Sequence, residues 1–247
     1  MDPSRIAELL EPFLENAPTV RNLSFRGGYS PEESAFLSES QLKQISTYLD
    51  LLLRWNARVN LTAIRKPEEI VTRHFGESLF VARCLFPTRS TWGQPPPAVP
   101  ELHDLLDLGS GAGFPGLPIK IWAPSVHVTL IESNQKKATF LREVVRTLGL
   151  TDLDVFPERA ETFPIQAQVV TLRAIEHFEN ILPTALRLVE AGGRIALLIG
   201  EGQVAVARKH AIDVTWNDPI PIPLSLSRVL LIGRLNGRNQ TEHEPIP

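Results

Sequence analysis

A run of alternate glycines bounded by carboxylates is the part of the sequence best suited to hold a small ligand. Asp107 stands two residues before the first of them, and the glycines are Gly109, Gly111 and Gly113. Glu132 follows 23 residues after Gly109. Glycines let a backbone turn tightly and approach a ligand closely. An acid at about this distance after the loop is typical of carboxylates that bind ribose hydroxyls. The pattern therefore predicts a nucleoside-containing cofactor.

Two cofactors fit this loop. The segment from Gly111 to Gly116 matches the dinucleotide fingerprint G-x-G-x-x-G, which indicates NAD. The segment from Asp107 to Gly113 reads acid-x-Gly-x-Gly-x-Gly, as S-adenosylmethionine loops do. The acid favours S-adenosylmethionine, because a carboxylate attracts an ammonium and a sulfonium and repels a pyrophosphate. A glycine turn without any ligand is the third interpretation, and Glu132 argues against it.

The elements that must position this loop alternate between short apolar runs and amphipathic ones. The loop follows a strand and opens a helix, and Arg173 ends a later strand. Alternation of this kind predicts a Rossmann-like α/β fold with a doubly wound, mostly parallel sheet. The expected strands are 102–108, 126–131, 154–156, 169–172, 194–199 and 228–234, and the expected helices are 117–122, 135–148, 182–190 and 204–211. Gly192 and Gly193 are expected to stop the helix that ends at residue 190.

The first part of the chain has a helical pattern instead. We expect helices over residues 1–16, from Ser38 onward, and after Pro67; Ser38 and Gln41 are spaced like a capping box. Four prolines between residues 93 and 100 exclude an element interior there. The predicted organisation is a helical region at 1–92, a linker at 93–100, an α/β domain at 101–235 that contains the glycine loop, and a polar tail at 236–247.

Charge and composition limit the classes of function. The net charge of −3 argues against a generally basic nucleic-acid binder. The sequence contains no run of 18 apolar residues, so it predicts no membrane span. The start of the chain does not resemble a signal peptide, and a single cysteine excludes an internal disulfide, so we expect a cytoplasmic protein. Residues 51–90 nevertheless hold seven basic and three acidic residues, a local net charge of +4. This stretch is either an RNA-binding surface or an ordinary solvated helical face.

Several short motifs outside the cofactor loop resemble one family. The chain is similar to the bacterial ribosomal RNA small subunit methyltransferase G family, also called glucose-inhibited division protein B. The resemblance extends over about residues 49–199. It lies in Trp55-Asn56, Asn60-Leu61-Thr62, Arg73-His74 with Glu77-Ser78, the loop from Asp107 to Gly116 with its Pro-Gly end, Glu132-Ser133 with Lys136-Lys137 and Phe140-Leu141, Arg159-Ala160-Glu161, and Arg173-Ala174. Two positions depart from the family pattern: Ile199 stands where a lysine is usual and Leu172 where a serine is usual.

The resemblance implies a class I S-adenosylmethionine-dependent methyltransferase that modifies a guanine N7 in 16S ribosomal RNA. It implies Arg173 as the catalytic-site residue, in contact with cofactor and substrate, although Arg173 could also be an ordinary surface arginine. The implied cofactor-binding residues are Asp107, Gly109, Gly111, Gly113, Phe114, Glu132, Ala160, Glu161 and Arg173. The implied RNA-binding residues are Arg65, Lys66, Arg73, His74, Lys136 and Lys137. The expected partner is 16S rRNA or the 30S subunit, with no membrane, no metal and a monomeric enzyme.

Methylation at guanine N7 does not require a conventional catalytic acid or base. Guanine N7 carries a free lone pair, so methylation there needs no general base, and positioning with electrostatics can supply the catalysis. We therefore expect no conventional acid or base residue. Two other functions stay open: an inactive methyltransferase-fold protein that binds RNA or assists ribosome assembly, and a methyltransferase of small molecules.

Overall fold

A computed structural model describes residues 1–15, 37–87, 104–173 and 178–236. Its centre is an eight-stranded sheet in the order β3-β2-β1-β4-β5-β8-β6, with β7 paired to β8. Strands β1 to β5 are parallel to one another, while β8 is antiparallel to β5 and to β6 and β7. The strands are β1 Asp104–Leu108, β2 His127–Ile131, β3 Leu153–Phe156, β4 Ala167–Arg173, β5 Val189–Gly200, β6 Val214–Trp216, β7 Ile220–Pro221 and β8 Arg228–Leu235. The doubly wound, mostly parallel sheet predicted from the sequence is confirmed.

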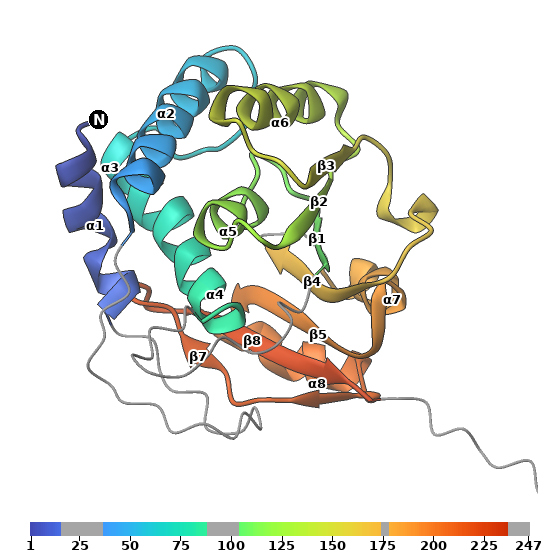
Figure 1. Cartoon of the computed structure of the whole chain (residues 1–247). Helices are drawn as coiled ribbons and strands as arrows, with labels where there is room; N and C mark the ends of the chain where they lie inside the picture. Colours follow the sequence, from blue (N-terminus) through green and yellow to red (C-terminus); the bar gives the residue numbers. More distant parts are fainter. Residues whose placement is uncertain (16–36, 88–103, 174–177, 237–247) are drawn as a thin grey trace, which may run out of the picture.

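Helices cover both faces of the sheet (Figure 1). One face packs against α5 and α6 and also against the N-terminal helices, in a single apolar cluster that extends from Ile6 to Ile232. The other face packs against α7 and α8. The helices are α1 Pro3–Glu15, α2 Glu39–Asn56, α3 Pro67–Ile70, α4 Glu77–Leu85, α5 Gly116–Trp122, α6 Gln135–Leu148, α7 Phe178–Arg187 and α8 Val204–His210, with short 3-10 turns η2 Ala160–Thr162 and η3 Glu201–Gln203. None of them, within the described residues, is long and apolar enough to cross a membrane.

The N-terminal helices follow local sequence signals. The capping box at the start of α2 forms as predicted, with Ser38 accepting from the Gln41 amide and the Gln41 side chain accepting from the Ser38 amide. The helix predicted after Pro67 is interrupted by a π-helical turn, η1 Val71–Gly76, between α3 and α4. Such turns are rare and frequently occur at functional sites. This one carries Arg73 and His74.

Two expectations about the later chain are wrong. The helix predicted over residues 182–190 is α7 Phe178–Arg187, and Gly192 and Gly193 lie inside β5 instead of ending a helix. A Cβ on Gly193 would lie 2.9 Å from the Gln168 carbonyl, so the glycine permits the close approach of β5 to β4. Strands β6 and β7 were not predicted, because two or three residues are too short to show a period. The linker expected at 93–100 lies outside the described residues, as does the tail beyond Asn236, so these boundaries stay predictions.

Candidate active site

The glycine loop leaves the carboxyl end of β1, next to the point where the strand order reverses between β1 and β4. In doubly wound sheets, ligands bind at this kind of reversal. Gly109, Gly111 and Gly113 all have left-handed backbones, with φ of 67°, 59° and 94°. The amides of Gly109 and Ser110 donate to the Ile131 carbonyl at the end of β2, at 2.9 and 3.1 Å. The loop is therefore fixed to the neighbouring strand.

The three glycines have different surroundings. A Cβ on Gly113 would collide with the Leu117 side chain and the Tyr48 hydroxyl, so this glycine serves internal packing. At Gly111 the nearest atom to an added Cβ is the Gly109 carbonyl oxygen at 3.8 Å, so this glycine borders open space. A cofactor that approaches the loop has room at Gly111, and a side chain there would project into that room.

Glu132 lies directly beside this space. Its carboxylate accepts from the Gly111 amide at 2.9 Å and from the Asn134 amide at 2.8 Å, one on each oxygen. Each carboxylate oxygen has two lone pairs, so both can accept a further hydrogen bond. The residue is 7% exposed, so little of it is accessible to solvent. Its free lone pairs could accept from two ribose hydroxyls, and this contact stays a prediction.

Asp107 lies deeper than the sequence interpretation supposed. It has no exposed surface; its carboxylate accepts from the Gly116 amide at 3.1 Å and from the Thr171 hydroxyl at 2.8 Å. Burial raises its pKa to about 6, although these hydrogen bonds oppose the shift. The side chain thus braces the loop against the start of α5 and against β4. Its direct contact with the cofactor stays a prediction.

Phe114 joins the loop to the N-terminal helices. Its ring stacks on Tyr48 with centroids 5.4 Å apart and on His74 at 4.9 Å, and the Phe75 ring meets it edge-on at 5.1 Å. The Tyr48 hydroxyl donates to the Ala112 carbonyl inside the same loop. The helical region therefore holds the cofactor loop in shape.

Ala160 and Glu161 form the turn η2 after β3. Ala160 is buried, whereas Glu161 is exposed, and both carbonyls accept from the Arg187 guanidinium, at 3.0 and 3.2 Å. Arg187 was not foreseen from the sequence. It fixes the turn that carries two of the implied cofactor-binding residues.

A pocket of about 310 Å³ opens next to the glycine loop, at the carboxyl ends of β4 and β5. Arg173 ends β4 and projects into it. Its guanidinium is 9% exposed and lies 3.0 Å from the Glu77 carboxylate, so it is not an ordinary surface arginine. The pocket is lined by Arg73, His74, Glu77, Leu172, Arg173, Phe178, Leu198, Ile199, Gly200, Gln203 and Arg228.

Glu77 is the centre of an ionic cluster in this pocket. It is 2% exposed and contacts Arg73, Arg173 and Arg228, which come from three separate elements. Burial raises the pKa of Glu77, whereas the three arginines lower it. With the carboxylate ionised, one negative and three positive charges leave the pocket cationic. In the sequence, Glu77 is distinguished only as part of a motif, and Arg228 was not predicted, because a lone arginine that begins a strand carries no signal.

His74 is a neutral member of the cluster. Burial, followed by the charges of Arg173, Arg73 and Arg228, lowers its pKa to about 3. Its Nδ1 lies 3.1 Å from the Arg173 guanidinium, which can only donate, so the ring proton is on Nε2, 2.7 Å from the Thr62 hydroxyl. His74 orients Arg173 and cannot act as an acid near neutral pH.

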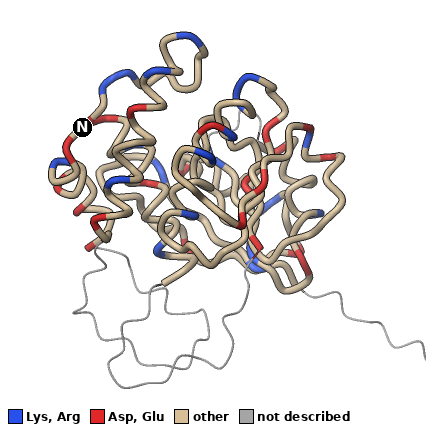
Figure 2. The backbone as a smooth tube through the Cα atoms, turned by 45° about the horizontal axis from the view of Figure 1, so that its top comes forward, with Lys and Arg blue, Asp and Glu red and all other residues tan. Residues whose placement is uncertain are grey.

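The residues expected to bind RNA do not form one cluster. Arg73 and His74 line the pocket, whereas Lys136 and Lys137 begin α6 beyond Asn134, whose side chain accepts from both of their amides. Arg65 donates to the Asn56 carbonyl and to the Asn60 side chain, and Lys66 is exposed at the start of α3. Figure 2 shows basic and acidic residues interleaved over most of the described backbone.

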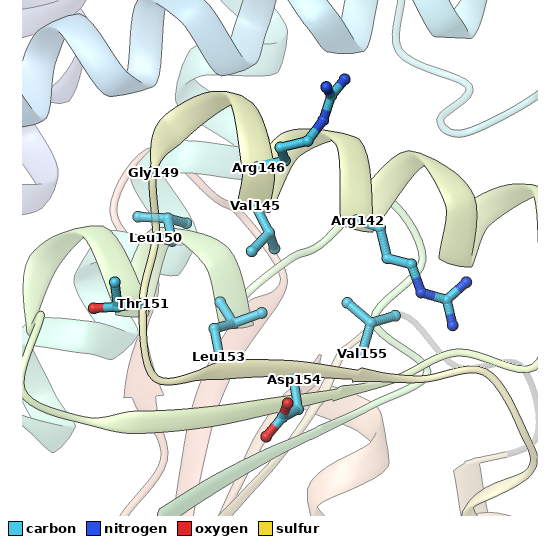
Figure 3. A pocket seen from close by; sticks show the side chains of 9 residues that line it. All are labelled: Arg142, Val145, Arg146, Gly149, Leu150, Thr151, Leu153, Asp154 and Val155. Carbon is cyan, nitrogen blue, oxygen red and sulfur yellow. The ribbon is translucent and has the colours of Figure 1, made fainter.

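A larger pocket, of about 490 Å³, lies between α6 and the edge strand β3 (Figure 3). It is lined by residues such as Arg142, Arg146 and Leu153 and contains none of the predicted site residues. Its place beside the last strand of the sheet, away from the reversal between β1 and β4, separates it from the glycine loop. We therefore assign the site to the smaller pocket and the loop.

Known proteins resemble the chain over most of its length. The family model described as GidB, rRNA small subunit methyltransferase G, matches residues 41–220. The protein named ribosomal RNA small subunit methyltransferase G from Chloroflexus aggregans is 41% identical over 209 residues, which cover 79% of this chain and 82% of that protein. Proteins of the same name are 39% identical in Roseiflexus castenholzii, over 79% of this chain and 84% of the relative, and in Xylella fastidiosa, over 76% and 84%.

Proposed function

Because the chain belongs to the rRNA small subunit methyltransferase G family, we propose that it transfers a methyl group from S-adenosylmethionine to a guanine N7 of 16S rRNA. The observation that carries this proposal is the adjacency of two sites of different chemistry. The glycine loop and Glu132 end β1 and β2, and the cationic pocket ends β4 and β5. Since Leu108 of β1 pairs with Leu172 of β4, the two sites open side by side at one edge of the sheet.

The loop fits the cofactor. Space at Gly111 and two carboxylate oxygens on Glu132 suit a ribosyl ligand, and bound S-adenosylmethionine supplies an activated methyl group. Among its predicted contacts, Gly109, Gly111 and Gly113 shape the loop, Phe114 supports it, and Ala160 and Glu161 contact the adenine.

The pocket fits a nucleobase. Its lining includes Leu172, Phe178 and Ile199, which suit a flat ring, together with the arginine cluster. Arg173 and Arg228 can donate to guanine O6 while N7 keeps its lone pair free for the transfer. His74 is a weak base, because its pKa is about 3 and the Arg173 guanidinium occupies its Nδ1, and Asp107 is enclosed. Both features agree with a reaction that needs no proton removal.

Arg228 also bears on one departure from the family pattern. The lysine usual before the glycine at the end of β5 is replaced by Ile199, whose side chain is apolar. Arg228 pairs with Gly200 across the β5–β8 ladder and lines the same pocket. We infer that it supplies the positive charge on this side of the pocket. The leucine at position 172, where a serine is usual, is explained by none of the residues that the structure describes.

The finer features of the partner are part of the same proposal. We infer that the N-terminal helices and the start of α6 face the RNA through Arg65, Lys66, Arg73, Lys136 and Lys137. The substrate is the 16S rRNA or the 30S subunit that contains it, and the enzyme acts as a cytoplasmic monomer with a helical region, a linker and a methyltransferase domain.

Modification mapping in cells tests the function. In a strain that lacks the gene, mass spectrometry of 16S rRNA should show one 7-methylguanosine fewer, and the wild-type gene should restore it. A Gly111→Val gene should not restore it, at equal protein level. An unchanged set of modified nucleotides in the deletion strain would contradict the proposal and favour an assembly factor without methyl transfer.

A further inference from the structure

The turn between β7 and β8 displays two large apolar side chains to solvent. Leu224 is 70% exposed and Leu226 is fully exposed. Among the described residues, only Ile165 and Ile212 are comparable, and they are far apart in sequence from this turn and from each other. Single exposed apolar residues are common in proteins. Two in one short turn, separated by one residue, are a reason to look for something that covers them.

The turn is held in a fixed shape. Ile222 donates to the Arg228 carbonyl, Ser225 donates to the Ile222 carbonyl, and the Arg228 amide donates to the Ser225 hydroxyl, each at 3.1 Å. Leu224 has a φ of 58°, a left-handed conformation that is unfavourable for leucine. Such conformations persist where the surroundings impose them, and they concentrate at sites that clamp ligands. A fixed turn also loses little conformational freedom when a partner binds.

The turn forms part of the rim of the proposed substrate pocket. Arg228, which lines the pocket, comes two residues after Leu226. The Ser227 carbonyl accepts from the Glu201 amide at 2.8 Å, and Glu201 follows Gly200, another lining residue. The turn that carries the exposed leucines is thus joined directly to residues that line the cationic pocket.

We propose that Leu226, supported by Leu224, packs against the nucleobase next to the target guanine in the RNA. This inference rests on the proposed function. A guanine that enters the pocket leaves its stack, and the adjacent nucleotide, tied to it by one phosphodiester, must lie at the rim. The face of that base is then uncovered, and apolar side chains next to flipped bases cover such faces. The cationic groups beside the turn, Arg73 and Arg228, suit the intervening phosphate.

A pair of serine variants tests this contact. Leu226→Ser should lower kcat/KM for methyl transfer to rRNA by about 5- to 150-fold, which corresponds to the loss of one stacked base. Cofactor affinity should not change. Ile212→Ser is the matched control, because Ile212 is 82% exposed and lies near Val214, which pairs with Leu235 at the opposite end of β8. Equal activity of the Leu226→Ser variant and the parent would overturn the proposal.

RNA lacking single bases identifies what Leu226 touches. Two RNAs are compared, each of which lacks the base of one neighbour of the target guanine. Removal of the base that contacts Leu226 should slow methyl transfer by the parent, whereas methyl transfer by Leu226→Ser should be no slower than with intact RNA. If the variant is impaired to the same extent on intact RNA and on both single-base-deleted RNAs, the leucine does not pack on a neighbouring base. If the impairment occurs with 30S particles and not with naked rRNA, the partner is a ribosomal protein, and the proposal is wrong.

A fluorescent variant separates this inference from the proposed function. Leu226→Trp replaces leucine with a flat and largely apolar side chain that can stack on a base, so it should retain activity. When an rRNA fragment containing the target guanine binds, its indole emission should change more than that of the parent, which has four tryptophans of its own. The same fragment should leave the emission of Ile212→Trp unchanged. Absence of methyl transfer by the parent would contradict the proposed function, while the emission change still reports the contact. No emission change at saturating RNA would overturn the contact itself.

Discussion

The two halves of the active site are built in different ways. The central part of the cofactor half, the glycine loop with Asp107 and Glu132, lies within 26 residues, and several of its hydrogen bonds join side chains to backbone amides. The substrate half combines residues that are up to 155 positions apart, from Arg73 to Arg228, and is held by an ion cluster around Glu77. The first half is built mainly by one strand–loop–helix unit and the end of the neighbouring strand, whereas the second exists only when the whole fold has formed. Variants should therefore separate cofactor binding from RNA methylation.

The largest expected effect is loss of the cofactor when Gly111 gains a side chain. Gly111→Val should weaken S-adenosylmethionine binding at least about 100-fold, because the added atoms fill the space next to Glu132. Gly149→Val is the control for backbone strain: its φ is 63°, close to the 59° of Gly111, and an added Cβ there meets nothing within 4 Å. Calorimetry with S-adenosylmethionine and with NAD decides the matter. Similar affinities in the two variants, or tight binding of NAD alone, would show that the loop is not this cofactor's site.

The next largest effect is expected in the substrate half. Arg173→Ala should slow methyl transfer by roughly 10- to 1,000-fold, equivalent to roughly 1.4–4 kcal/mol, because a positioned cation is lost beside the reacting groups. Arg173→Lys should be intermediate, since lysine keeps the charge without the guanidinium fork. Single-turnover rates at saturating RNA and saturating S-adenosylmethionine give the comparison, so that a weaker cofactor contact does not enter the rate. An unchanged rate for the alanine variant would remove Arg173 from the catalytic site.

The buried carboxylate of the cofactor half should make stability depend on pH. The pKa of Asp107 is about 6 in the folded chain against 3.8 for a free side chain, so the folded state holds the proton more tightly. Stability should therefore fall as pH rises from about 4 to about 6 and then stay constant, a change on the order of 3 kcal/mol. Asp107→Asn should lack this part of the profile, as urea unfolding at pH 4.5 and 7.5 would show. If the free energy of unfolding depended on pH in the same way in variant and parent, the pKa of Asp107 would not be raised in the folded state.

The smallest expected effect concerns the outer RNA surface. Replacing Arg65 and Lys66 together with alanine should reduce the salt dependence of RNA affinity, because each phosphate contact adds about 0.7 to the slope of log affinity against log salt. We expect a slope smaller by roughly one to 1.4 units and an unchanged affinity for the cofactor. The matching variant at the start of α6 replaces Lys136 and Lys137. Parallel lines for parent and Arg65/Lys66 variant, with a smaller slope for the Lys136/Lys137 variant, would move the RNA surface to α6.

The contrast between the two halves also explains what the sequence could predict. The glycine loop, the capping box at Ser38 and the spacing to Glu132 are local signals. The capping box is confirmed, and Glu132 lies beside the loop as its spacing indicates, whereas their contacts with the cofactor stay predictions. The Glu77 cluster depends on a π-helical turn and on a strand pairing that joins Gly200 to Arg228, and neither leaves a local pattern. The helix end predicted at residue 190 was wrong for the same reason, because a contact between distant segments leaves no local pattern. Gly193 was interpreted by its usual role at helix ends, but contact with β4 determines its conformation.

Methyl transfer by the purified protein tests the central claim most directly. The protein should be incubated with S-adenosylmethionine and either 16S rRNA or 30S subunits from the deletion strain, and the RNA then cleaved chemically at 7-methylguanine. We predict cleavage at one guanine, with close to one methyl group per RNA molecule, and none with the Gly111→Val variant. The account would be contradicted if neither substrate acquired 7-methylguanosine although the protein bound both the cofactor and the RNA.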